Sequence, residues 1–255
     1  MTMEFPRSAA RASRLDVVAR TGSTNADLRA HAHDTTSWPH LSVLVTRDQT
    51  AGRGRLDRVW IAPAGAALAI SVILRPRMDH ALRGWIPLIA GVAMADAISE
   101  QVAARDVAVK WPNDVLVDGL KICGILAEAS DDAVIVGAGV NTAMTVEQLP
   151  VPTATSFAVL GAVADEDRLL ADYLDRLDEL LGMLSASGDP MAGGVHAAAV
   201  ARSASIGREV EVTLPGGRML VGTAVALDDE GRLVVSADGR REAVSAGDVV
   251  HARRA

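Results

Sequence analysis

The 255-residue chain has a single cysteine and no long apolar run. Because Cys123 stands alone, an intramolecular disulfide is excluded, and no CxxC or histidine-rich spacing indicates structural zinc. Cys123 lies inside an apolar strand pattern, where we expect a small core side chain rather than a nucleophile. No segment approaches the ~20 apolar residues of a membrane span, and the N-terminus lacks an apolar run of signal-peptide length. We therefore expect a soluble, cytoplasmic protein that does not contact membranes.

An excess of positive charge is also missing. The formal net charge is -7 and the pI is about 5.4, which argues against non-specific electrostatic binding to nucleic acid. A local cluster of arginines could still bind a phosphate. The composition, 49% hydrophobic and 22% charged, is typical of a globular enzyme, and the length allows one large domain plus a small one.

Lysine is nearly absent. Of the 25 lysine and arginine residues only Lys110 and Lys121 are lysines, which leaves 23 arginines. Both lysines fall within one segment, VKWPNDVLVDGLKICGILAE. Lysine and arginine differ in donor geometry and pKa behaviour, so these two positions suggest that a compact point charge is needed. The alternative is that two surface lysines survived side by side by chance.

The pattern around the two lysines predicts a strand, a turn and a second pair of strands. Residues 107–111 form a short apolar run that Pro112 interrupts, because proline removes a backbone donor. Residues 115–117 then read as a strand, Asp118-Gly119 as a tight hairpin turn, and residues 121–128 as the partner strand. Both lysines are therefore expected on a sheet that forms a pocket wall.

Two polar segments stand elsewhere in the chain. Ser23-Thr24-Asn25 follows a short strand and precedes a helical pattern, so these residues either cap the helix or form the polar end of a pocket. Residues 47–60 alternate glycine with arginine and carry Gln49 and Trp60 near the two ends, a pattern that could close over an anion. A solvated charged loop is the alternative. The segment matches neither a Rossmann turn nor a P-loop.

The remaining patterns predict an α+β fold. Strands are expected at residues 15–19, 41–46, 68–74 and 133–140, and helices at residues 26–32, 85–98 and 165–185. From residue 206 onward short period-two strands separated by turn signals predict a small all-β barrel. We expect a domain of residues 1–205, with residues 1–13 flexible, and a second domain of residues 206–255.

The Ser-Thr-Asn cap, QTAGRGR, KWPND, the lysine of GLKICGIL and GAGVN occur in this order. With these motifs, residues 14–255 resemble the biotin protein ligases, the biotin-[acetyl-CoA-carboxylase] ligase family. The resemblance implies a mixed-sheet catalytic domain related to class II aminoacyl-tRNA synthetases, followed by an SH3-like barrel. It also implies that biotin and ATP, with Mg²⁺, give biotinyl-5'-AMP, and that biotin is then transferred to a lysine of a biotin carboxyl carrier domain of an acyl-CoA carboxylase.

The resemblance also implies roles for individual residues. Trp60 would pack at the adenine side, Asn141 near the nucleotide, and Lys121 on the carboxylate and phosphate. Arg55, Lys121 and Asp114 would be catalytic, with Asp114 orienting the carrier lysine, although a turn-capping aspartate is an equal alternative. No protein ligand for a metal is identified. The full set of residues expected to bind biotin or the adenylate is Ser23, Thr24, Asn25, Gln49, Gly52, Arg53, Gly54, Arg55, Trp60, Lys110, Asn113, Lys121, Gly124 and Asn141.

The chain departs from the family in two places. Leu56-Asp57 stands where some members have Arg-Gly, and the chain starts too near its first motif to carry the winged helix-turn-helix of repressor-type members. We therefore expect no DNA binding, while a weak or ligand-dependent homodimer remains open. The alternatives are a lipoate or octanoate ligase, a non-catalytic biotin-binding protein, and an interaction module that would explain only residues 206–255. The loop from Gln49 to Trp60 is expected to be mobile until a ligand orders it.

Overall fold

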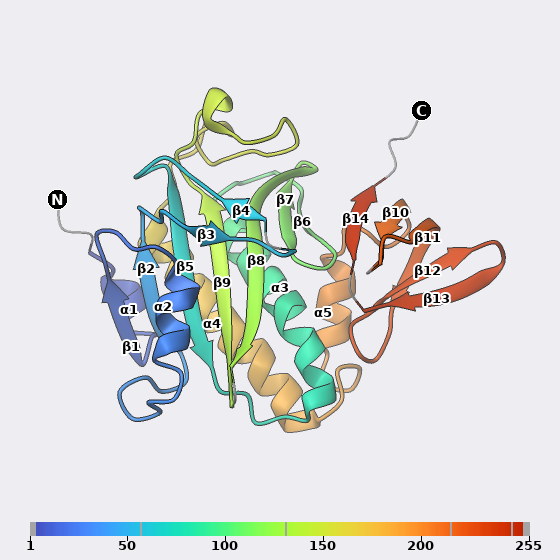
Figure 1. Ribbon diagram of the computed structural model, residues 1–255, viewed down its shortest axis with the longest axis horizontal. Helices are drawn as coiled ribbons and strands as arrows, with labels where there is room; N and C mark the ends of the chain where they lie inside the picture. The colour runs from blue at the N-terminus through green and yellow to red at the C-terminus, as the bar shows by residue number, and fades with distance from the viewer. Residues whose placement is uncertain (1–3, 57, 131, 215, 246, 252–255) are drawn as a thin grey trace.

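A mixed seven-stranded sheet is the largest element of the computed structural model, which describes residues 4–56, 58–130, 132–214, 216–245 and 247–251 (Figure 1). The strand order is β1-β2-β5-β9-β8-β7-β6, with β1 and β2 parallel and the other neighbours antiparallel. In that order the strands are β1 (Arg14–Val17), β2 (Ser42–Thr46), β5 (Ala67–Leu74), β9 (Ala133–Asn141), β8 (Leu120–Ser130), β7 (Asp114–Val117) and β6 (Val107–Lys110).

The two faces of this sheet are covered by different elements, because successive residues of a strand point to opposite faces. In β2, Val43 and Val45 belong to the main core, whereas Leu44 packs with Leu28 of α2 (Thr24–Ala30). α3 (Ile86–Ser99) and α4 (Glu166–Ser187) lie behind the sheet in Figure 1, and α5 (Val195–Ala201) lies beside α3 towards the C-terminal sheet. α2 and a short hairpin, β3 (Gly52–Arg53) with β4 (Val59–Trp60), lie in front of it. Burial on both faces explains the continuous apolar run of β5.

The lysine-bearing segment folds as its sequence predicts. β6 and β7 are antiparallel neighbours, and β7 turns into β8 through Asp118 and Gly119, whose φ angles are +50° and +81°. Positive φ at both central positions matches the strand twist of a tight hairpin. Lys110 ends β6 and Lys121 lies near the start of β8, so both lysines are on the sheet.

The long helix predicted near residues 165–185 is α4. The Asp165 side chain caps it by accepting a hydrogen bond from Arg168 N, and Gly188 ends it in the left-handed conformation. Its apolar stripe is buried as core, as predicted: Leu169, Leu170, Tyr173, Leu174, Leu177, Leu180, Leu181 and Leu184.

One segment corrects the expectation about apolar length. The 3-10 helix η1 (His80–Trp85) runs into α3, and together His80–Ser99 is long and apolar enough to cross a membrane by length and composition alone. However, 67% of its most apolar window is buried inside the protein. α3 is therefore placed as the core helix between the sheet and α4.

The N-terminal segment differs from the expected flexible tail. Residues 6–9 form α1 (Pro6–Ala9), and Phe5 and Ser8 are buried. Ser8 N and Oγ both donate to the Asp167 carboxylate, at 2.9 and 2.8 Å. Residues 4–13 are thus attached to α4 and β1, a long-range contact that local composition does not reveal.

The C-terminal part is a five-stranded antiparallel sheet of order β13-β12-β11-β10-β14. Its outer face and core face alternate along β10, where Val210 and Val212 are buried between exposed neighbours. This confirms the small all-β unit after the mixed sheet, while the expected boundary at residue 205 stays a prediction. The strands are β10 (Glu209–Thr213), β11 (Met219–Leu227), β12 (Leu233–Ala237), β13 (Arg240–Val244) and β14 (Asp248–His251).

Candidate functional site

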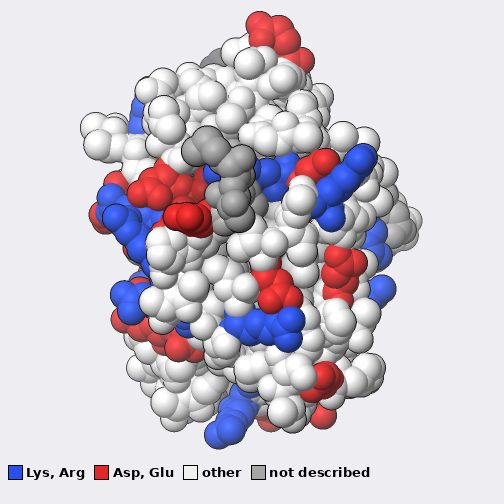
Figure 2. Space-filling view, turned by 90° about the vertical axis from the view of Figure 1, so that its left-hand side faces the viewer, with Lys and Arg blue, Asp and Glu red and all other residues white. Residues whose placement is uncertain are grey.

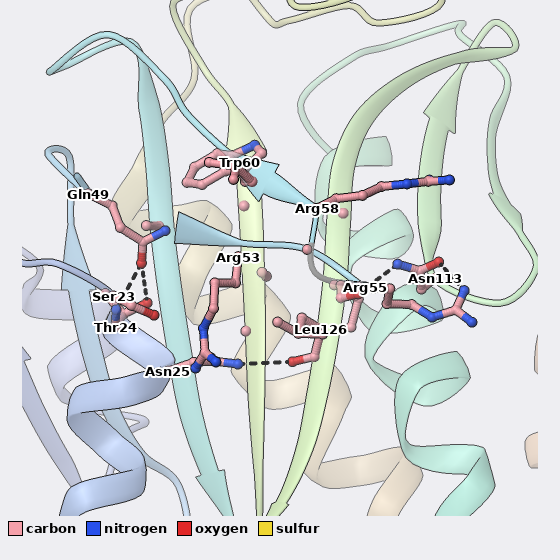
Figure 3. A pocket seen from close by; sticks show the side chains of 18 of the residues that line it. Ser23, Thr24, Asn25, Gln49, Arg53, Arg55, Arg58, Trp60, Asn113 and Leu126 are labelled. Atoms are coloured by element: carbon pink, nitrogen blue, oxygen red, sulfur yellow. Dashed lines mark hydrogen bonds between the residues drawn. The ribbon is translucent and has the colours of Figure 1, made fainter. Parts of the chain in front are cut away.

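A cavity of about 200 Å³ lies on the front face of the mixed sheet, under the β3–β4 hairpin (Figure 3). Its floor is formed by β5, β8 and β9, one end by the start of α2, and the other end by the KWPND segment. Most of the predicted site residues line it: Ser23, Thr24, Asn25, Gln49, Arg53, Gly54, Arg55, Trp60, Asn113, Asp114, Lys121 and Gly124.

The α2 end of the cavity is rich in neutral hydrogen-bonding groups, and the ion pair of Arg53 with Glu128 lies beside them at Asn25. Thr24 N and Oγ1 both donate to Gln49 Oε1, at 2.8 and 3.0 Å (Figure 3). Ser23 also caps α2 by accepting a hydrogen bond from Ala26 N at 3.4 Å. The helix-cap and pocket interpretations are therefore both correct, because a helix N-terminus leaves backbone N–H groups and their capping side chains pointing out of the helix.

Sequence reasoning missed Ser71, which holds this polar end together from below. Ser71 is fully buried in β5, and its Oγ lies 2.7 Å from Thr24 Oγ1 and 2.6 Å from Asn25 Oδ1. Asn25 Nδ2 donates to Glu128 Oε2 at 2.8 Å. A hydroxyl in the middle of the apolar run LAISVIL was the only available signal, since a buried hydroxyl needs a hydrogen-bonding partner.

The other end of the cavity carries the lysine pair. Lys121 Nζ lies 2.5 Å from Asp114 Oδ1, and Lys110 Nζ lies 3.5 Å from Asp114 Oδ2. A Cβ on Gly124, which is the register partner of Asp114, would come within 3.1 Å of Lys121 Nζ. Glycine at 124 thus leaves room for the ammonium group. Asp114 thus bridges two cations, which differs from the turn-capping role. Its catalytic role stays a prediction.

The hairpin over the cavity is built on close packing. A Cβ on Gly52 would lie 2.4 Å from Gln49 Nε2 and 2.6 Å from the Trp60 carbonyl oxygen. The Trp60 ring in turn covers Gly139, whose Cβ position is 2.9 Å from it. Gly52 and Gly139 are therefore required by contact rather than by chain flexibility. Asp57, which with Leu56 departs from the family pattern, lies outside the described residues.

Two arginines of the hairpin reach partners on other elements. Arg55 Nη1 donates to Asn113 Oδ1 and Arg55 Nη2 to the Gly247 carbonyl, both at 3.2 Å. Arg53 Nη2 lies 3.4 Å from Glu128 Oε1. Mutual repulsion among these arginines is thus offset by polar groups on β8, the KWPND segment and the C-terminal sheet.

Three predicted residues are not among those that line the cavity: Gly52, Lys110 and Asn141. Asn141 is buried and its Nδ2 donates to the Thr155 carbonyl at 2.9 Å, so in this structure it fixes the segment after β9. Trp60 lines the cavity between its two ends, close to Gln49 and against Gly139, which is the register partner of Gly124. Further lining residues that the sequence did not single out are Leu56, Arg58, Val59, Ala69, Ile70, Ile125 and Leu126.

The remaining reactive groups nearby are buried. Burial raises the pKa of the Cys123 thiol to about 12 and also raises the pKa of the Tyr173 hydroxyl. The thiol therefore stays protonated and acts as a core side chain, as predicted. Among the described residues no group of three or more His, Cys, Asp or Glu side chains could hold a metal ion, and Asp114 is the carboxylate in the cavity lining.

The two ends of the cavity differ in chemistry. The α2 end offers neutral donors and acceptors for a polar ring, and the far end offers the cations Lys121 and Arg55 for an anion. The middle is lined by small or apolar residues, including Gly137, Ala138 and Ile125. Such a cavity suits a molecule with a polar head, an apolar centre and a carboxylate tail.

Known proteins share both the sequence and the fold of this chain. A family model described as "Biotin/lipoate A/B protein ligase family" matches residues 17–141, and one described as "Biotin protein ligase C terminal domain" matches residues 205–252. The biotin--[acetyl-CoA-carboxylase] ligase of Mycobacterium tuberculosis is 42% identical over 244 residues, covering 94% of this chain and 89% of that one. The ligase of the same name from Paracoccus denitrificans is 31% identical over 247 residues, 91% and 98% of the two chains.

A solved structure agrees with these relatives. The biotin protein ligase from Aquifex aeolicus, in complex with biotin and ATP, superposes with a TM-score of 0.76 and 26% identity, covering 95% of this chain and all of that one. The similarity spans both the mixed sheet that forms the cavity and the C-terminal sheet beside it. With a cavity suited to a ring and a carboxylate, and with relatives matched over nearly their whole length, this chain belongs to the biotin protein ligases of the biotin/lipoate A/B protein ligase family.

Proposed function

We propose that this protein activates biotin with ATP to biotinyl-5'-AMP and then transfers biotin to one lysine of the biotin carboxyl carrier domain of an acyl-CoA carboxylase. The observation that carries the proposal is the polarity of the cavity, with neutral donors and acceptors around Thr24 and Gln49 at one end and cations at the other. The biotin ureido ring fits the neutral end, because a buried ring of donors and acceptors needs partners of both kinds. The biotin carboxylate then reaches the cationic end.

The cations at the far end of the cavity reduce the electrostatic repulsion between the two anionic substrates in the first step. Joining a carboxylate to the α-phosphate of ATP brings two anions together, and two unit charges 4 Å apart repel by about 4 kcal/mol at an effective dielectric of 20. Lys121 and Arg55 offset this repulsion, and both are held in place by Asp114 and Asn113 before substrate arrives. Preorganised cations cost no rearrangement at the moment of reaction.

Mg²⁺ would enter with ATP. Mg²⁺ usually keeps several waters and binds through one or two carboxylates and substrate phosphates. Because Asp114 is already engaged by Lys121 and Lys110, the phosphate oxygens would supply most of the ligands. The ion would neutralise charge on the departing pyrophosphate.

The adenine contact that the resemblance implied for Trp60 stays a prediction. Trp60 lies beside Gln49 and against Gly139, so a ring bound near Thr24 would be covered by the indole face. We propose that Trp60 also contacts the biotin ring. Asn141 would act near the nucleotide indirectly, because its side chain fixes the segment at Thr155.

The second step needs a neutral amine. The carrier lysine begins with a pKa near ~10.4 and must lose a proton before it attacks the mixed anhydride. Asp114 is the carboxylate of the cavity lining that could orient this amine.

The partner and location follow from the same proposal. The carrier is the biotin-accepting domain of a carboxylase, and the reduced thiol of Cys123 fits the cytoplasm. DNA is not expected to bind, because the net charge is -7 and basic and acidic side chains interleave on the face of the molecule that Figure 2 shows. A weak or ligand-dependent homodimer stays a prediction.

Mass spectrometry of a biotin carboxyl carrier domain incubated with this protein, biotin and MgATP tests the proposal. We expect the mass of the carrier to rise by one biotinyl group, and to remain unchanged without ATP. A parallel incubation with lipoate tests the lipoate ligase alternative. Modification by lipoate and not by biotin would overturn the proposal, and binding of biotin without pyrophosphate release would favour a non-catalytic binding protein.

A further inference from the structure

A tight turn of the C-terminal sheet, residues 228–232, is held by two tryptophans of the other part of the chain. Trp85 Nε1 donates to the Asp229 carbonyl at 2.8 Å, and Trp111 Nε1 donates to the Gly231 carbonyl at 3.1 Å. The two side chains are 0% and 3% exposed. Since a buried indole N–H needs a partner, each bond fixes the turn relative to its tryptophan.

The turn is itself rigid. Asp228 N donates to the Arg232 carbonyl at 3.0 Å, and the Asp228 carboxylate accepts hydrogen bonds from Glu230 N and Arg232 N at 3.0 and 2.9 Å. Gly231 has a φ of +78°, and a Cβ there would meet the Trp85 ring at 3.3 Å. Because its own hydrogen bonds close the turn, its backbone carbonyls are fixed acceptors for the two indole N–H groups.

The two tryptophans lead into different parts of the molecule. Trp85 leads directly into the core helix α3. Trp111 stands two residues before Asn113 and three before Asp114, both of which line the cavity. The backbone N of Trp111 also donates to Ser205 Oγ at 3.1 Å, so Trp111 is held at two atoms.

Asn113 and Asp114 are the residues that arrange the cationic end of the cavity. Asn113 accepts from Arg55 at 3.2 Å and donates to the Ile125 carbonyl at 2.8 Å, and Asp114 pairs with Lys121. A shift of the chain at residue 111 would therefore change the positions of both cations. The cavity lining does not include Trp111 itself.

We propose that Trp111 is a positioning residue, and that the turn at residues 228–232 acts through its indole to set Asn113 and Asp114 relative to Lys121. The C-terminal sheet thus supports the reacting end of the cavity from behind, besides contacting it in front where Arg55 reaches the Gly247 carbonyl. The kinetic part of this inference rests on the proposed biotin ligase function, and the positional part does not.

The test compares Trp111→Phe with Trp85→Phe in the full chain. Each variant keeps an aromatic ring and removes one indole donor to the same turn, so both should lower the urea midpoint of unfolding to a similar degree. We expect Trp111→Phe to lower kcat for biotin-dependent pyrophosphate release about tenfold, with KM for biotin changed by less than about twofold. Trp85→Phe should change both constants by less than about twofold.

A structural readout accompanies the kinetics. In ¹⁵N NMR spectra, the Asn113 side-chain amide should shift in Trp111→Phe and stay at the wild-type position in Trp85→Phe. If Trp111→Phe does not fold, Ser205→Ala takes its place, since it removes the partner of Trp111 N with a smaller change in volume. We expect the same selective loss of kcat and the same shift.

Three results would overturn the inference. They are equal kinetic losses in the two tryptophan variants, an unchanged kcat in a folded Trp111→Phe or Ser205→Ala protein, and an Asn113 amide that does not move. A wild-type protein that releases no pyrophosphate from ATP and biotin contradicts the proposed function instead. In that case the Asn113 amide alone decides whether Trp111 positions the segment.

Discussion

Two hairpins bring cations to the same cavity, and they are held in different ways. The β7–β8 hairpin belongs to the seven-stranded sheet, and its Lys121 pairs with Asp114 of the same hairpin. The β3–β4 hairpin pairs through two residues on each strand and leaves Leu56 and Val59 68% and 70% exposed. Its Arg53 pairs with a residue of another element, Glu128 of β8.

The difference separates a fixed charge from an adjustable one. A backbone ladder of many hydrogen bonds holds Lys121 whether or not a ligand is present, whereas Arg53 depends on a partly exposed ion pair of the kind that typically contributes about 0.2–1 kcal/mol. We infer that the β7–β8 hairpin holds Lys121 in place permanently, and that the β3–β4 hairpin closes over the cavity and brings Arg55 with it. Substitutions in and around the two hairpins can break this division, and the largest effect is expected at Lys121.

Replacing the fixed charge should cost the most. We expect Lys121→Ala to lower biotinyl-5'-AMP formation about 100-fold or more, on the order of 3 kcal/mol of lost charge stabilisation, measured as pyrophosphate release. Lys110→Ala is the matched control, because Lys110 pairs with the same Asp114 but is not among the residues that line the cavity. Its loss should stay below about fivefold. Near-normal turnover by Lys121→Ala would remove Lys121 from the catalytic group.

Acid should weaken the C-terminal sheet, in which His251 ends β14 and pairs with Val210 of β10. Burial lowers the pKa of His251 to about 4, and the nearby charges of Lys110 and Arg208 act in the same direction. The unfolded chain, with a pKa of about 6.5, binds a proton before the folded one does, so this contribution to stability is complete above pH ~6.5 and is lost as the pH falls towards ~4.

His251→Gln cannot titrate and should remove that part of the pH dependence. From pH 7.5 to pH 5, we expect the free energy of unfolding to decrease less in the variant than in the wild type. The two decreases should differ by on the order of 1 kcal/mol, after allowing for the partial exposure of the ring. Urea unfolding at the two pH values is the measurement. Parallel curves for the two proteins would show that His251 does not titrate in this window.

The smallest effect concerns the adjustable hairpin. Glu128→Gln should speed trypsin cleavage after Arg53 about twofold, because the carboxylate that holds this guanidinium loses its charge. Arg29→Gln is the control, since Arg29 shares Glu128 Oε1 at 3.3 Å and its loss leaves that oxygen to Arg53. Biotin with MgATP should slow cleavage in every variant, whereas MgATP alone should not. Equal rates with and without biotin would show that the hairpin does not close on a ligand.

Much of the site was predictable because its residues cluster in short motifs. The rarity of lysine pointed to Lys110 and Lys121, and proline followed by a turn signal predicted the strands around them. The sequence did not indicate Ser71 or Glu128, because each is a single polar residue in an apolar strand. Their contacts form only when α2 packs across the sheet. Asn141 was expected beside the nucleotide for its motif, yet its side chain faces Thr155.

The sequence by itself determined most strands of the two larger sheets and the helices α2, α3 and α4, since strand periodicity, turn residues and helix caps depend on neighbours along the chain. It also determined most residues of the two chemical ends of the cavity, which come from the Ser-Thr-Asn, QTAGRGR and KWPND motifs and the lysine of GLKICGIL. Only the tertiary structure decided which carboxylate pairs with which cation, that residues 4–13 attach to α4, and that Trp111 meets the turn at residues 228–232. These contacts join residues up to 160 positions apart, and their formation depends on the packing of whole elements, which no local pattern records.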